Sequence, residues 1–264
     1  MTAYLLVTHG SRDPRPQAEA GVLARLVAEL LQAAALPSAV ASSAAAPSAS
    51  STVVATMPLV GTAVLELHPL PLHQQIQQFA EHAIATGHSR LLIVPLFLLP
   101  GVHVLEDLPA AVAIAQSMLQ PSFTLNVSPY LGSYPPLQHQ LQQLLMADHT
   151  GTPERQQILL SHGSRRPGGN APVEAIAAKL NAIPAYWSAV PQLDEQVSSL
   201  VQQGCQQIEI LPYFLFTGKI TDAIAQLVAD LATQFPQLSL HLAKPLGATP
   251  PLASLIVDLI RSLA

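Results

Sequence analysis

The sequence has few charged residues, a single cysteine and no long apolar run, and each shortage excludes a class of protein. Only 10% of the 264 residues are charged, with a formal net charge of −5 and no run of lysine and arginine. We therefore do not expect a nucleic-acid-binding surface. Cys205 has no second cysteine with which to form a disulfide, and we interpret it as a small residue of the core.

The longest strongly apolar stretch, LLIVPLFLLPGVHVL (91–105), is too short and too often interrupted to cross a membrane. It has 15 residues, including two prolines, a glycine and a histidine, whereas a spanning helix needs about 20 predominantly apolar residues. We interpret it as a buried strand and the loop that follows. The chain does not begin with a basic segment followed by an apolar one, so no secretion signal is expected. These features predict a soluble cytoplasmic protein with no membrane partner.

Three segments recur in the same order, which indicates an internal duplication. The paired segments are THGSR (8–12) with SHGSR (161–165), GHSRLLIVPLFLLPG (87–101) with GCQQIEILPYFLFTG (204–218), and PYLGSYPPL (129–137) with KPLGATPPL (244–252). The first pair is 153 residues apart and the second is 117 apart, so the first copy holds 36 extra residues between these segments. We predict two similar domains, 1–149 and 150–264, with a flexible insertion rich in alanine, serine and proline at 37–56.

Apolar, strand-like runs alternate with helix-like segments in the first copy. Strands are expected at 3–8, 60–66, 91–97 and 123–128, and helices at 71–86, 105–119 and 135–147, with a further helix after the first strand. Because strands that alternate with helices form a parallel sheet covered on both faces, each copy is predicted to be a small, doubly wound, Rossmann-like α/β domain. Ligands of such domains bind beyond the carboxyl ends of the strands.

Three candidate metal ligands lie where strands end. His9 follows the first strand, Glu66 ends the second, and His103 comes shortly after the third. Two imidazoles and a carboxylate at one sheet edge make an open site suited to Fe²⁺, Co²⁺ or Ni²⁺, and neutral imidazoles also accept protons near pH 7. His68 is a weaker candidate, and His9 taken alone could equally be a hydrogen-bonding loop residue.

The second copy lacks two of these three ligands. It keeps His162, but Lys219 or the residue after it stands in place of His103, and a position near Ser188 stands in place of Glu66. We therefore expect metal chemistry in the first copy only. The second copy would form a wall of the cleft between the two domains.

Basic and hydroxyl side chains in the same loops are suited to anionic groups. Ser11 and Arg12 follow the first strand near a helix start, where hydroxyl, amide and guanidinium groups bind a carboxylate or a phosphate. In the second copy, Arg165, Arg166 and Lys219 are available for the same purpose.

These motifs together resemble one family. The segments LLVTHGSRDPRPQA, VPLFLLPGVHVLEDLP, LLSHGSRRPGGN and LPYFLFTGKITDAI are similar to those of the sirohydrochlorin chelatases of siroheme and cobalamin synthesis, class II chelatases that insert iron or cobalt. The resemblance covers nearly the whole chain except the insertion. It implies two similar lobes with the tetrapyrrole in the cleft between them. It also implies that His9 and His103 contact the metal, with Glu66 as the matching glutamate.

The resemblance further implies the reaction and the polar lining of the cleft. Inserting one Fe²⁺ or Co²⁺ replaces two pyrrole N–H protons, so we hypothesise that His9 and His103 deliver the metal and accept the protons, with Glu66 assisting. Sirohydrochlorin carries eight carboxylates, and the basic residues expected to bind them are Arg12, Arg15, Arg165, Arg166 and Lys219. No organic cofactor or nucleotide is required, and no GxGxxG or Walker sequence is present to bind one.

Two other functions remain open at this point. A non-catalytic carrier of metal or tetrapyrrole would keep the same residues for binding, and multiple turnovers would distinguish an enzyme from it. A histidine phosphatase would need an arginine directly before the strand-end histidine, whereas Thr8 and Ser161 stand at those positions. Iron and cobalt accept the same imidazole and carboxylate ligands, so the metal is left open. Because a two-lobed chain closes its own cleft, a monomer is expected.

Overall fold

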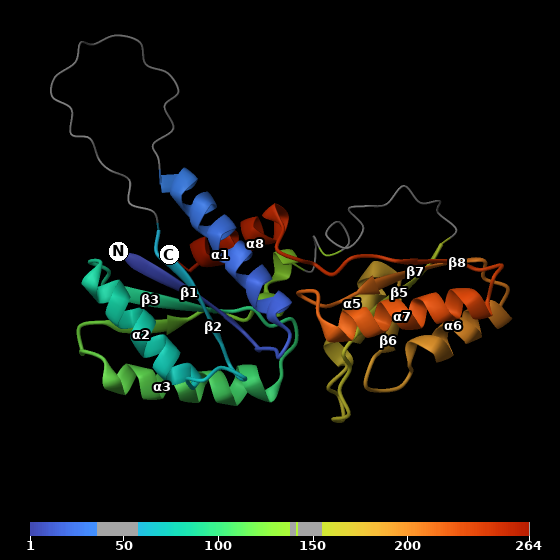
Figure 1. Ribbon diagram of the computed structural model, residues 1–264, viewed down its shortest axis with the longest axis horizontal. Helices are drawn as coiled ribbons and strands as arrows, with labels where there is room; N and C mark the ends of the chain where they lie inside the picture. Colours follow the sequence, from blue (N-terminus) through green and yellow to red (C-terminus); the bar gives the residue numbers. More distant parts are fainter. Residues whose placement is uncertain (36–57, 138–140, 142–154, 264) are drawn as a thin grey trace, which may run out of the picture.

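The computed structural model describes residues 1–35, 58–137, 141 and 155–263, and it consists of two α/β lobes side by side (Figure 1). Each lobe contains a four-stranded parallel sheet with helices packed against it. The predicted fold class, two similar doubly wound α/β domains, is confirmed. The insertion predicted at 37–56 and most of the helix predicted at 135–147 lie outside the described residues.

The first sheet has the strand order β2-β1-β3-β4. Its strands are β1 (Thr2–Thr8), β2 (Val60–Val64), β3 (Arg90–Pro95) and β4 (Thr124–Val127). The central strands β1 and β3 are mostly apolar and mostly buried. This is the pattern of strands that are covered on both faces.

Helices cover both faces of the first sheet. They are α1 (Pro14–Ala35), α2 (Leu72–Ala85) and α3 (Leu108–Met118), and α3 follows a π-helical turn, His103–Asp107. Because neighbouring residues of a strand point to opposite faces, Leu5 packs in one cluster with Ile76 of α2, whereas Leu6 packs in another with Leu23 of α1. α1 therefore lies on the face opposite α2 and α3 (Figure 1).

The second lobe repeats this arrangement with the strand order β6-β5-β7-β8. Its strands are β5 (Gln156–Ser161), β6 (Ile183–Tyr186), β7 (Gln207–Pro212) and β8 (Ser239–Leu242). The helices packed on this sheet are α5 (Ala171–Leu180), α6 (Leu193–Gln202) and α7 (Lys219–Gln234), and α8 (Pro250–Arg261) follows β8 at the end of the sequence. The same order of neighbouring strands in both sheets agrees with a duplicated unit.

The last helix of the chain joins the two lobes. α8 belongs to the second half of the sequence, yet it packs against α1 of the first lobe (Figure 1). Leu252, Ile256 and Leu259 of α8 are almost fully buried, in a cluster that also contains Leu6 of the first sheet and Leu159 of the second. Because this cluster contains residues of both sheets, the two lobes share one apolar core. Each such buried side chain contributes about 1.5–3 kcal/mol of stability.

Some element ends differ from the prediction. The second strand was expected to reach Glu66, but β2 ends at Val64. The pairing with the neighbouring segment nevertheless continues, because the N–H of Glu66 donates to the carbonyl of His9 at 3.0 Å. The helix expected from 105 begins two residues earlier, as the π-helical turn at His103.

Cys205, predicted to be a core residue, is half-buried and packs at the margin of the second lobe's apolar cluster. None of the helices in the described ranges combines the length and the apolar character needed to cross a membrane.

Candidate metal centre and interlobe cleft

Three adjacent strands of the first sheet carry the candidate metal ligands beyond their carboxyl ends. β1 leads directly into His9, Glu66 lies two residues after β2, and His103 begins the π-helical turn that follows β3. Because the three strands are neighbours in the order β2-β1-β3, their ends meet at one edge of the sheet. The fold thus brings together side chains that are up to 94 residues apart in the sequence.

His9, Glu66 and His103 form a compact group. Each offers one ligand atom, and these atoms lie within 4.8 Å of one another. The two imidazole rings are nearly perpendicular, with centroids 4.7 Å apart and an interplanar angle of 89°. His9 and Glu66 are exposed and His103 is half-buried, so an incoming ligand can reach the group. Two imidazoles and a carboxylate with open positions are suited to Fe²⁺, Co²⁺ and Ni²⁺.

Gly10 allows the loop after His9 to approach the segment that carries Glu66. Its φ is +101°, a conformation that glycine adopts readily and that residues with a Cβ rarely adopt. A Cβ at this position would lie 2.1 Å from the carbonyl oxygen of Glu66. The close approach and the hydrogen bond from Glu66 to His9 together fix the two ligand-bearing backbones against each other.

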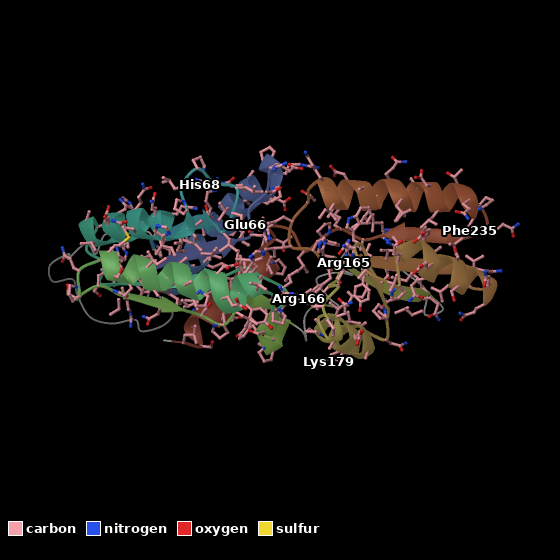
Figure 2. All side chains as sticks on the ribbon, turned by 90° about the horizontal axis from the view of Figure 1, so that it is seen from below. Glu66, His68, Arg165, Arg166, Lys179 and Phe235 are labelled. Carbon is pink, nitrogen blue, oxygen red and sulfur yellow. The ribbon has the colours of Figure 1, made fainter. Side chains whose placement is uncertain are left out.

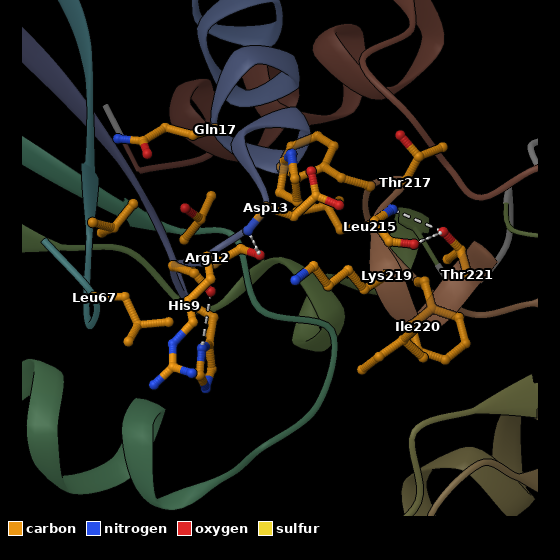
Figure 3. Close-up of a pocket in the computed structure, with 18 of the residues that line it drawn as sticks. His9, Arg12, Asp13, Gln17, Leu67, Leu215, Thr217, Lys219, Ile220 and Thr221 are labelled. Carbon is orange, nitrogen blue, oxygen red and sulfur yellow. Dashed lines mark hydrogen bonds between the residues drawn. The ribbon is translucent and has the colours of Figure 1, made fainter. Parts of the chain in front are cut away.

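A cleft of about 700 Å³ opens beside this group and is lined by both lobes. Figure 3 shows His9, Arg12 and Leu67 on the side of the first lobe, and Lys219 and Ile220 on the side of the second. The loop before α7 adds further apolar side chains to the lining, namely Phe214, Leu215 and Phe216. A cleft with mostly apolar walls and a few cationic groups fits a ligand that combines apolar surface with anionic groups.

The predicted anion-binding residues are distributed unevenly around the cleft. Ser11, Arg12 and Lys219 line it. Arg165 and Arg166 are exposed on the second lobe, at its end nearest the first (Figure 2), and lie outside the cleft lining. The Nε of Arg165 donates a hydrogen bond to the carbonyl of Ser188 at 3.3 Å.

Arg15 is already engaged with two carboxylates. Its Nη2 lies 2.6 Å from Oδ2 of Asp13, and its Nη1 donates to Oδ1 of Asp222 on α7 at 3.0 Å. Hydrogen bonds from Arg15 lower the pKa of Asp13 to about 2 and also lower the pKa of Asp222. Arg15 therefore connects the first lobe to the helix that begins with Lys219.

The second lobe keeps the loop geometry but not the ligands. The N–H of Ser188 donates to the carbonyl of His162 at 2.9 Å, as Glu66 does to His9. Ser188 thus occupies the position that corresponds to Glu66, and it carries a hydroxyl instead of a carboxylate. In the part of the chain that the structure describes, the first lobe alone gathers three such metal ligands.

His162 and His68 are not members of the candidate metal-binding group. His162 lines the same cleft as His9, and burial, followed by the charge of His9, lowers its pKa. The Nδ1 of His68 accepts a hydrogen bond from the N–H of Leu70 at 3.0 Å. The weaker candidate ligand is therefore not part of the group.

Two features of the site were missed in the sequence. The carboxylate of Asp107 accepts a hydrogen bond from Nδ1 of His103 at 2.7 Å; an aspartate four residues after a histidine at a helix start is the signal that could have found it. Glu19 of α1 accepts hydrogen bonds from the N–H, at 3.0 Å, and the hydroxyl of Thr217 in the other lobe. No sequence signal identifies partners 198 residues apart.

The fold and this group of side chains define a class: two-lobed α/β proteins with an open imidazole and carboxylate centre at an interlobe cleft. The sequence model of the CbiX family matches residues 3–147 and 156–263, nearly the whole chain. The chain therefore belongs to the CbiX family.

Relatives with named activities agree with this assignment. The chain is 25% identical over 212 residues to the sirohydrochlorin cobaltochelatase of Priestia megaterium, covering 76% of this chain and 68% of that protein. It is 26% identical over 197 residues to the sirohydrochlorin ferrochelatase of the same organism, covering 71% and 73%. Among solved structures, SirB from Bacillus subtilis with Fe³⁺ superposes with a TM-score of 0.73 at 22% identity, covering 100% of this chain and 95% of that one. The superposition supports the fold.

Proposed function

We propose that this protein is a chelatase that inserts Fe²⁺ or Co²⁺ into sirohydrochlorin. The observation that carries the proposal is the group of His9, Glu66 and His103, of which His9 also lines a cleft shared by both lobes. Membership of the CbiX family and relatives named as cobalto- and ferrochelatases of sirohydrochlorin support the same reaction.

The reaction exchanges protons for a metal. Sirohydrochlorin loses two pyrrole N–H protons and gains one divalent ion, so the site must supply a weakly held metal and accept two protons. In our proposal, His9 and His103 hold the incoming ion through neutral imidazole nitrogens, and Glu66 offsets part of its charge. When the ion moves to the macrocycle, the vacated nitrogens accept the pyrrole protons and pass them to solvent. The exposure of His9 gives those protons a direct exit.

The cleft would hold the macrocycle by its faces and its edges. We assign the flat faces to apolar side chains on the opposite walls, Leu67 and Ile220, which are 58% and 38% exposed. We assign the carboxylates nearest the metal to Ser11, Arg12 and Lys219, because a guanidinium or ammonium bound to a carboxylate makes the stronger kind of hydrogen bond.

The remaining basic residues receive outer roles in this proposal. We assign Arg165 and Arg166, exposed on the second lobe, to the outermost carboxylates of the macrocycle. Arg15 binds two protein carboxylates, so we assign it to holding α7, and hence Lys219, in place. Both walls of the cleft come from one chain, and we propose that the active unit is a monomer.

The experiment that tests this function is an anaerobic absorbance time course. Purified protein at limiting concentration is mixed with sirohydrochlorin and either Fe²⁺ or Co²⁺, beside the variants His9→Ala and His103→Ala. We expect metallation over many turnovers by the wild type and loss of that rate in both variants, and the faster metal identifies the physiological one. Tight binding of the macrocycle with no rate above the buffer control would show a carrier instead of an enzyme.

A further inference from the structure

We propose that Asp107 is a positioning residue that fixes the tautomer and the orientation of His103. The Oδ2 atom of Asp107 lies 2.7 Å from Nδ1 of His103. That distance falls within the range of hydrogen bonds in which one partner is ionised, about 2.7–2.9 Å. This role goes beyond the proposed insertion reaction but rests on it, because it concerns how one of the candidate ligands is presented.

The chemistry of the two groups determines which nitrogen of His103 is free. An ionised carboxylate only accepts hydrogen bonds, so Nδ1 of His103 must carry the proton. A neutral imidazole has a single N–H, and Nε2 therefore keeps its lone pair. Metal-binding histidines are generally fixed in this way by a carboxylate or carbonyl bound to the second nitrogen, which also makes the ring more basic as a ligand.

The local backbone holds both partners in place. The turn His103–Asp107 is π-helical, a rare form that occurs frequently at functional sites. The N–H of Leu108, which follows the turn, donates to the carbonyl of His103. Leu108 itself is 1% exposed in the apolar cluster of the first lobe. His103 is thus tied through its backbone and its ring to a turn that is anchored in the core.

Among the residues that the structure describes, no carboxylate is hydrogen-bonded to the ring of His9, which contacts the ring of His103 edge to face. The Nδ1 of His9 lies 3.4 Å from the carbonyl of the adjacent Gly10, a long contact compared with the one between His103 and Asp107. We therefore infer that orientation by a carboxylate is specific to His103, and that loss of Asp107 affects this ligand alone.

The test measures Co²⁺ binding to the full chain without the macrocycle, by titration of the cobalt absorption bands. We expect Asp107→Ala to weaken Co²⁺ binding about 10- to 100-fold, the usual effect of removing such a partner. Asp107→Asn should recover most of the affinity, because its amide oxygen still accepts from Nδ1. Glu106→Gln is the matched control, since it removes the same charge from an exposed side chain of the same turn, and it should leave the affinity unchanged.

A second measurement reports the tautomer directly. In ¹⁵N-histidine NMR spectra of the metal-free protein, His103 should be the Nδ1–H form in the wild type and shift toward the Nε2–H form in Asp107→Ala. Asp107 is 48% exposed, so the substitution should not unfold the protein. Asp107→Leu, which matches the shape and has no acceptor, repeats the test if the alanine variant is unstable.

The outcomes separate this inference from the proposed function. Equal weakening by Asp107→Ala and Glu106→Gln would show a charge effect and overturn the positioning role. Wild-type Co²⁺ affinity in Asp107→Ala, together with loss of binding in His103→Ala, would overturn it while leaving the metal centre intact. Wild-type affinity in His103→Ala would remove the metal centre itself, and with it both proposals.

Discussion

The turn at Gly10 gives the sharpest prediction, because one methyl group added there should disturb both the backbone and the metal centre. In Gly10→Ala, the new Cβ would lie 2.1 Å from the carbonyl oxygen of Glu66, whereas real contacts of this kind stay at or above 3.0 Å. The two segments must therefore separate by about 0.9 Å. Functional sites tolerate misplacement of about 0.5 Å, so the carboxylate of Glu66 should leave its position beside His9.

The expected cost has two parts. A non-glycine residue with positive φ costs about 1–2 kcal/mol, and overpacking against backbone adds about 1–3 kcal/mol. The free energy of unfolding should therefore fall by roughly 2–5 kcal/mol. At about 2–4 °C per kcal/mol for a domain of this size, Tm should fall by roughly 4–20 °C. The Kd for Co²⁺ should rise about 10- to 100-fold, as is usual when a ligand loses its supporting geometry.

The duplicated fold supplies matched controls. Gly163 has φ of +81° in the corresponding loop of the second lobe, and a Cβ there would lie 2.7 Å from Cβ of Tyr186. Gly163→Ala should lower Tm by a similar amount and leave the Co²⁺ affinity unchanged. Gly87 has φ of +83° with open space around it. Gly87→Ala should therefore lower the free energy of unfolding only by the cost of the backbone conformation, about 1–2 kcal/mol.

Calorimetry and cobalt titration of the three variants test whether the contact between Gly10 and Glu66 supports the metal centre as well as the fold. The reasoning fails if Gly10→Ala loses stability but binds Co²⁺ as tightly as Gly163→Ala does. In that case the contact between Gly10 and Glu66 would support the fold alone.

Further predictions concern the cleft and the contact between the lobes. Lys219→Gln should raise the KM for sirohydrochlorin about 10-fold and spare kcat, because it removes one hydrogen bond to a charged group; steady-state kinetics with Lys219→Arg as the control checks this. Leu67→Ala should raise the same KM about fivefold through lost apolar contact of roughly 1 kcal/mol, with Met118→Ala, an exposed residue outside the cleft lining, as the control. Arg15 lowers the pKa of Asp13 from 3.8 to about 2. The interaction between Arg15 and Asp13 therefore stabilises the folded protein fully above pH 4, and this stabilisation is lost as the pH falls toward 2. The Tm difference between wild type and Arg15→Gln should therefore narrow from pH 5 to pH 2, and a constant difference would refute the assignment.

Much of the site could be predicted, because in this fold the order of strands and helices along the sequence determines where the residues after each strand lie. Once strands and helices alternate, parallel strands end at one edge, and residues that follow three strands must lie near one another. His9 and His103 could be selected on that basis alone. Glu66 could be placed to within a few residues, although its strand ends earlier than the apolar pattern suggested.

Partners far apart in the sequence could not be predicted. Arg15 is predicted to bind the substrate, and the contact of its guanidinium with Asp222, 207 residues away, has no signal in the sequence. The packing of α8 against the first lobe was equally hidden, because an amphipathic helix shows which face is buried and not what covers it. Interactions between lobes depend on tertiary packing, which local pattern and spacing do not encode.

The most direct test of the central claim compares two histidines that the duplication placed in equivalent loops. Sirohydrochlorin metallation with Co²⁺ would be followed over many turnovers for His9→Ala and His162→Ala at saturating macrocycle. If the first lobe performs the chemistry, His9→Ala should lose nearly all of kcat and His162→Ala should retain it, even with a higher KM. Loss of kcat in His162→Ala with retention in His9→Ala would contradict the account and move the reaction to the second lobe.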